Sequence, residues 1–95
     1  MRVKRSLCFK EQFSHTVLQI AKDKKNAARE FKTSLNKVIN NIPTFSYKYR
    51  QSYYHSDNTI RDMIYQGYTV VYKIDEEKEL IEILEMFNKN LPKED

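Results

Sequence analysis

The sequence predicts an α+β fold with the element order β-α-α-β-β-β, in which a hairpin of two helices packs on a small antiparallel sheet. Two observations carry this prediction. Apolar residues recur at steps of three and four between Phe9 and Ile42, which is the period of an amphipathic helix. After Pro43 the period becomes two, which is typical of a strand with one buried face. With 95 residues the chain is too short for two cores, so one domain is expected over residues 1–95.

The first half of the chain is expected to form a short strand followed by the helical hairpin. The opening MRVKRSL is the expected strand, and Asn26 and Pro43 are expected to begin and end the second helix. The apolar positions are Phe9, Phe13, Val17, Ile20 and Ala21 in the first helix and Ala27, Phe31, Leu35, Val38 and Ile42 in the second. Because almost nothing separates the two helices, they are expected to run antiparallel.

The second half is expected to form three or four antiparallel strands joined by polar turns. The expected strands are residues 45–54, 59–65, 68–74 and 80–87. The period of the last segment also fits a helix, but a hairpin partner directly upstream favours a strand. Gln66-Gly67 holds the single glycine of the chain, at a point where a tight hairpin requires a positive φ.

The composition disfavours several classes of function. No run of about 18 apolar residues exists that could span a membrane, and the expected location is the cytoplasm. The single cysteine, Cys8, cannot form an internal disulfide and is expected to fill the core. Cys8, His15 and His55 show no ligand spacing, and one glycine cannot build a phosphate-binding loop, so neither a metal nor a cofactor is expected. His15 is expected to be solvated.

The charge is divided unevenly along the chain. Residues 1–50 hold 12 Lys or Arg against 3 Asp or Glu, a balance of +9, while residues 51–95 hold 5 against 10, a balance of −5. A basic half favours a polyanionic partner, and it suits an acidic protein partner equally well.

Residues 47–55, YKYRQSYYH, interleave tyrosines with cations. As a strand, the segment would turn Tyr47, Tyr49, Gln51 and Tyr53 to one face and Lys48, Arg50, Ser52 and Tyr54 to the other. In one interpretation the tyrosines pack on the helices and the second face is solvated. In the other, Lys48, Arg50 and Arg61 clamp phosphate and His55 transfers a proton, which is close to what RNA cleavage through a 2′-hydroxyl requires.

The chain resembles the RelE/ParE superfamily of toxins from type II toxin–antitoxin modules over nearly its whole length. The resemblance is carried by IRDMIYQGYTVVYKID, by LIEILEMFNKN, and by FKEQF and AAREFKTSLNKVINNIP in the front half. It implies a protein that inhibits growth when free and is neutralised by an antitoxin encoded beside it, whose acidic, partly helical segment wraps over the toxin. RelE-like members cut mRNA on the ribosome, whereas ParE-like members inhibit DNA gyrase.

Carried over position by position, the resemblance gives two sets of candidate site residues. The catalytic candidates are His55, Arg61 and Lys89, and the candidates for nucleic-acid or target binding are Lys48, Arg50, Tyr54 and Asn88. The final strand departs from the nuclease pattern, because Met86-Phe87-Asn88-Lys89-Asn90 stands where nucleases place arginine, histidine or tyrosine. This departure favours ParE-like gyrase inhibition. The alternatives are a RelE-like mRNA endonuclease, a non-toxic homologue that only binds a partner, and a basic nucleic-acid module outside the family.

Overall fold

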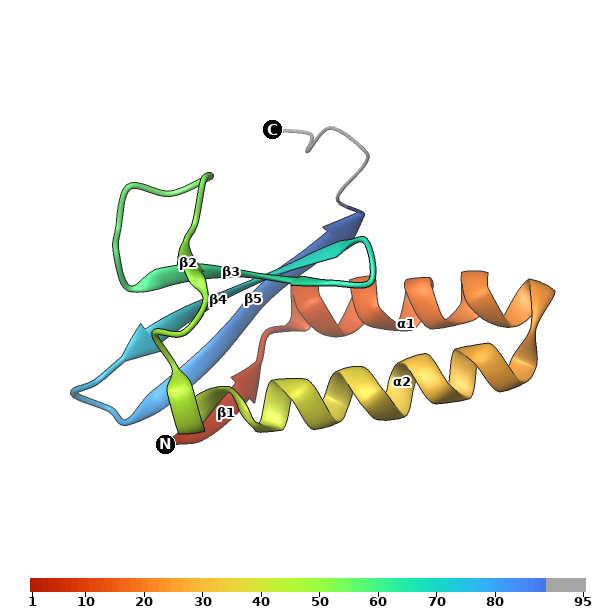
Figure 1. Cartoon of the computed structure of the whole chain (residues 1–95), viewed down its shortest axis with the longest axis horizontal. Coiled ribbons are helices and arrows are strands. Elements are labelled where there is room, and N and C mark those ends of the chain that lie inside the picture. The colour runs from red at the N-terminus through yellow and green to blue at the C-terminus, as the bar shows by residue number, and fades with distance from the viewer. Residues whose placement is uncertain (89–95) are drawn as a thin grey trace.

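The computed structural model describes residues 1–88, in which two helices cover one face of a five-stranded sheet (Figure 1). The helices are α1 (Leu7–Asp23) and α2 (Lys25–Asn40), and a short 3-10 helix, η1, spans Ile42–Phe45. The strands are β1 (Arg2–Arg5), β2 (Arg50–Gln51), β3 (Ile60–Tyr65), β4 (Tyr68–Asp75) and β5 (Leu80–Asn88). The α+β class and the order of helices and strands are those that the sequence predicts, and the final segment is a strand.

The sheet is mixed, which differs from the antiparallel sheet expected from the sequence. Its strand order is β1-β5-β4-β3-β2, and β1 pairs with β5 in parallel while the other pairs are antiparallel. A parallel pair requires a long connection. The helical hairpin and the three intervening strands provide this connection. The last strand, β5, therefore comes back to pair with β1, which forms one edge of the sheet.

The two helices form the expected hairpin, but the second helix begins at another residue than predicted. The Ser6 hydroxyl begins α1, since its Oγ accepts the Phe9 N–H (3.0 Å) and donates to the Leu84 carbonyl of β5 (2.7 Å). The turn between the helices is Lys24 alone, with an extended backbone (φ −144°, ψ 108°). Asn26 therefore lies inside the first turn of α2 and does not cap it.

The core lies between the helices and β3, β4 and β5. Its buried members are Phe9, Phe31, Leu35, Ile39, Ile42, Met63, Val70, Tyr72, Ile74, Ile81, Ile83 and Met86. The Phe31 ring makes edge contacts with the rings of Tyr65 (6.0 Å) and Tyr68 (5.5 Å), which anchors α2 on the β3–β4 hairpin. Cys8 is exposed, so the expectation that it fills the core is wrong; the adjacent Phe9 occupies the inward side of this turn of α1.

The predicted strand over residues 45–54 is wrong in extent, since only Arg50 and Gln51 pair with β3. Contacts distant in sequence hold the rest of this segment in turns. The buried hydroxyl of Tyr72 donates to the Ser46 carbonyl (2.6 Å), and burial raises the pKa of this phenol well above its usual range, so the proton stays in place. The predicted alternation fails as well, because Ser52 is 4% exposed and Tyr53 is 76% exposed.

No helix in the described part of the chain is long and apolar enough to cross a bilayer.

Candidate functional site

The predicted clamp of Lys48, Arg50 and Arg61 is divided between the two faces of the sheet. Successive residues of a strand point to opposite faces. Arg61 lies on the same face as Met63, which is in the core beneath the helices. Arg50 instead pairs with Asp62, on the face that carries no helices, which we call the open face. The structure therefore does not bring Arg50 and Arg61 together.

Arg61 uses its guanidinium to hold the segment between η1 and β3. Its Nε donates to the Asn58 carbonyl (2.9 Å) and its Nη1 donates to the Tyr49 carbonyl (3.1 Å). The guanidinium carbon also lies 4.9 Å from the centroid of the Tyr47 ring. These contacts tie both ends of the segment to β3 and give Arg61 a structural role.

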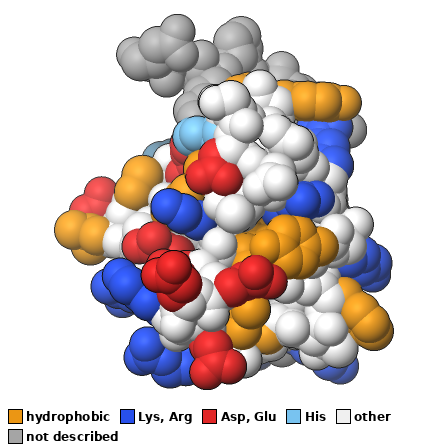
Figure 2. Space-filling model, turned by 90° about the vertical axis from the view of Figure 1, so that its left-hand side faces the viewer, with side chains coloured by type: hydrophobic (Ala, Val, Ile, Leu, Met, Phe, Trp, Pro, Cys, Tyr) orange, Lys and Arg blue, Asp and Glu red, His pale blue; other side chains and the backbone are white. Residues whose placement is uncertain are grey.

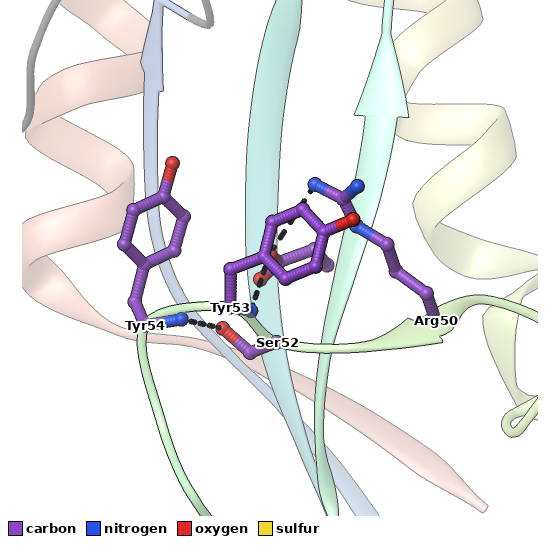
Figure 3. Close-up of polar contacts among 5 residues, drawn as sticks. Arg50, Ser52, Tyr53 and Tyr54 are labelled. Atoms are coloured by element: carbon purple, nitrogen blue, oxygen red, sulfur yellow. Dashed lines mark hydrogen bonds and ion pairs between the residues drawn. The ribbon is translucent and has the colours of Figure 1, made fainter.

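On the open face, Arg50 and Tyr53 cover the carboxylate of Asp62 (Figure 3). The Asp62 side chain is fully buried, and its Oδ2 accepts the Tyr53 N–H (3.2 Å) and lies 3.7 Å from Nη2 of Arg50. The guanidinium of Arg50 stacks on the Tyr53 ring, 3.8 Å from its centroid. The other oxygen, Oδ1, is buried and has no hydrogen-bond partner among residues 1–88. Asp62 thus holds both the Tyr53 backbone and the Arg50 side chain in place on the open face.

An apolar surface continues from Tyr53 across the sheet. Tyr54 packs its ring edge-on against Phe87 of β5 (5.2 Å between centroids, 85° between planes). Phe87 pairs with Thr69, and Thr69 pairs with Ile64, so these three residues form one row on the open face. We call Tyr53, Tyr54, Ile64 and Phe87, with Arg50 at the rim, the open-face patch.

His55 and Lys48 lie in the segment that Arg61 holds. The Nε2 atom of His55 is buried and has no hydrogen-bond partner in the described part of the chain. Nearby, the Thr59 N–H lowers the pKa of Asp57, and Lys73 and His55 lower it further. Lys48 is exposed, with its Nζ 5.5 Å from the Tyr49 ring centroid, and lines a shallow hollow beside Phe45.

A further predicted site residue, Asn88, directly follows Phe87 of the open-face patch in β5. Asn88 ends β5 opposite Tyr68 and lines an open hollow of about 550 Å³ between α1 and the ends of β4 and β5. Lys89 lies outside the described residues. His15 lines the same hollow and is exposed on α1, as expected. No group of three or more His, Cys, Asp or Glu side chains able to hold a metal ion occurs within residues 1–88.

A separate apolar groove lies on the helical hairpin. It has a volume of about 320 Å³ and is lined by Phe13, Ser14, Val17, Leu18 and Lys32. Leu18 is 65% exposed, which is high for a leucine beside other apolar side chains. The hairpin, residues 7–40, carries seven Lys or Arg against three Asp or Glu. The groove is therefore an apolar feature in basic surroundings.

The family is decided by a match over residues 3–88 to a family model described as the ParE toxin of the type II toxin–antitoxin system parDE. The chain belongs to the ParE toxin family. A search against curated proteins finds no match. Membership makes the chain a toxin of a type II toxin–antitoxin system and implies an antitoxin as its partner.

In this ParE-family toxin, sequence reasoning missed the residues that organise the open face. Asp62 carries one signal in the sequence, since a charged residue between Ile60 and Met63 in an apolar strand indicates a buried polar contact. The period of two predicts that Tyr53 packs inward, and nothing in its local pattern shows that it points outward. Phe87 marks only the absence of a nuclease residue in the sequence, and its contact with Tyr54 links segments 33 positions apart.

Proposed function

We propose that this ParE-family toxin acts by inhibiting DNA gyrase. The observation that carries the proposal is that the two arginines a nuclease would need, Arg50 and Arg61, point to opposite faces and are engaged in contacts within the protein. Arg61 is turned to the helical side and donates to two backbone carbonyls, and Arg50 is stacked on Tyr53 on the opposite face. The end of β5, Met86-Phe87-Asn88, offers no group that titrates near neutral pH. A protein target needs neither a phosphate clamp nor a proton-transfer pair.

The antitoxin is proposed to cover the helical hairpin. The groove beside Leu18 can bind apolar side chains of the antitoxin. The excess of Lys and Arg around it favours a segment that carries carboxylates. An amphipathic acidic helix would bury its apolar side in the groove and place carboxylates near Lys32. The proposed target would then contact the opposite layer of the molecule, the open face.

The second candidate is a RelE-like, ribosome-dependent mRNA endonuclease. The observation that favours it is the buried Nε2 of His55, which has no hydrogen-bond partner among residues 1–88. A proton-transfer group in an apo enzyme often lacks its final partner. In this reading, Lys48 and Arg50 bind phosphate and His55 or Lys89 transfers the proton.

Two measurements on the purified full-length chain separate these candidates. In a supercoiling assay with purified DNA gyrase, the gyrase proposal predicts inhibition that increases with toxin concentration. In a cell-free translation reaction, the same proposal predicts intact mRNA. Cleaved mRNA together with undisturbed supercoiling would replace it with the endonuclease, and a His55→Ala variant should then lose cleavage.

A further inference from the structure

The exposed aromatic side chains of the described residues come from one short segment of the chain. Within residues 1–88 they are Phe45 (67% exposed), Tyr47 (43%), Tyr53 (76%) and Tyr54 (45%), all from a segment of ten residues. Isolated exposed apolar residues need no explanation, but a group of exposed aromatics marks an interaction surface. Tyr53 and Tyr54 lie on the open face, where Figure 3 shows their rings side by side in front of the sheet, with the helices behind.

The open-face patch is held in shape before any partner binds. The backbone of Tyr53 is bonded to the buried Asp62, and its ring is stacked under Arg50. Tyr54 donates its backbone N–H to Ser52 Oγ (3.2 Å) and rests its ring on Phe87. Rings that are already fixed lose little conformational entropy when a partner covers them. The patch therefore has the rigid aromatic anchors that are typical of binding hot spots.

The charge of the segment that carries Tyr53 and Tyr54 favours a protein partner that places a carboxylate near Arg50; across the sheet, Glu85 lies in the open-face row of Asp62 and Val71. Residues 45–56 contain Lys48 and Arg50 and no Asp or Glu. The Arg50 side chain is 41% exposed and faces Asp62 through one nitrogen, so its outer edge remains open to a second acidic group. A nucleic acid would require a track of several projecting cations, and Arg61 is turned to the other face.

We propose that the open-face patch is the surface through which this toxin docks on its protein target, at a site where a carboxylate stands beside apolar side chains. The carboxylate pairs with Arg50, and the apolar groups cover Tyr53, Tyr54 and Ile64. This inference rests on the proposed gyrase inhibition and specifies its interface. The antitoxin is assigned to the opposite layer, so target and antitoxin contact different residues.

The first test compares two exposed apolar residues on opposite layers. Tyr53→Ser is expected to raise the toxin concentration for half-inhibition of purified gyrase roughly tenfold or more. Leu7→Ser, the matched control at the start of α1, is expected to leave inhibition unchanged. Both side chains are largely exposed (76% and 72%), so both variants are expected to fold, which a thermal melt checks.

The second test reads the sign of the partner's charge. Ile64 is 37% exposed on the open face, and Ile64→Glu and Ile64→Lys disturb the sheet to a similar degree. If the target presents a carboxylate, Ile64→Glu weakens inhibition several-fold more than Ile64→Lys. Equal or reversed effects would overturn the charge assignment even if either variant were less stable.

Other outcomes would assign the patch differently. Loss of antitoxin binding by Tyr53→Ser, with gyrase inhibition retained, would give the patch to the antitoxin. Loss of mRNA cleavage by Tyr53→Ser would give it to RNA. If the unmodified chain does not inhibit gyrase, the proposed function itself fails; if it does and Tyr53→Ser inhibits equally, the docking surface alone is wrong.

Discussion

Arg61 and Asp62 are neighbours in β3 whose side chains point to opposite faces of the sheet. Arg61 donates to the carbonyls of Tyr49 and Asn58 on the helical side of the sheet. Asp62 lies buried on the open face, where it accepts the Tyr53 N–H. Each residue fixes one part of the segment between η1 and β3. A basic residue in a predicted site can therefore be structural, and its contacts decide between the two roles.

We expect Arg61→Ala to destabilise the protein by about 1–2 kcal/mol, because two carbonyls lose a charged donor and Tyr47 loses its stacking partner. Urea unfolding measures the change. Arg29→Ala, the same truncation at an exposed position of α2, should stay within about 0.5 kcal/mol. Equal effects of the two substitutions would show that the Arg61 contacts contribute nothing to stability.

At the scale of elements, the β3–β4 hairpin shows how one turn sets a register. Gln66 and Gly67 both have positive φ (47° and 86°), which is the geometry of a two-residue type I′ turn. The register Tyr65 to Tyr68 follows from it and places Ile64, Thr69 and Phe87 in one row. A slip by one residue would turn Asp62 into the core and Met63 into solvent.

We expect Gly67→Ala to cost about 1 kcal/mol, because a side chain at this φ is strained. Within residues 1–88, no heavy atom apart from those of the two flanking residues lies within 4 Å of the added methyl group, so the cost is one of backbone conformation and not of collision. Gln66→Asn should act in the opposite direction by a few tenths of a kcal/mol, since asparagine tolerates a positive φ better. Thermal unfolding checks both, and a neutral Gly67→Ala would contradict the assigned turn.

At the scale of the whole molecule, the uneven charge of the sequence places excess positive charge on the helical hairpin and acidic side chains near the β4–β5 turn. The helical hairpin, residues 7–40, accounts for four of the nine excess positive charges of residues 1–50. Figure 2 looks onto the end of the sheet that carries the β4–β5 turn, where acidic side chains gather; Asp57, Asp75, Glu76 and Glu77 line a hollow there. An acidic partner segment is attracted to the hairpin and repelled by this end.

We expect Lys32→Glu to weaken antitoxin binding several-fold and to reduce its dependence on salt, because Lys32 lines the groove beside Leu18. Calorimetric titration at low and high ionic strength measures both effects. Lys78→Glu, the same change of charge in the β4–β5 turn, is the control and should bind like the unmodified chain. An equal loss for the two variants would mean that net charge, and not the groove, attracts the antitoxin.

Sequence pattern is sufficient to predict the helical hairpin, the three long strands, the Gln66-Gly67 turn and the superfamily. These features are encoded by apolar period and turn chemistry, which act over a few residues. It placed Arg50, Tyr54, His55 and Arg61 in one region of the chain, but it did not show that Arg50 and Arg61 lie on opposite faces of the sheet.

The conformation of residues 45–59 depends on the tertiary structure, because contacts from β3 and β4 override the local period of this segment. The hydroxyl of Tyr72, the guanidinium of Arg61 and the carboxylate of Asp62 each bind a backbone group of this segment. These bonds turn Ser52 inward and Tyr53 outward. The same reason explains the parallel pairing of β1 with β5, since both features depend on partners distant in sequence, which a local pattern does not record.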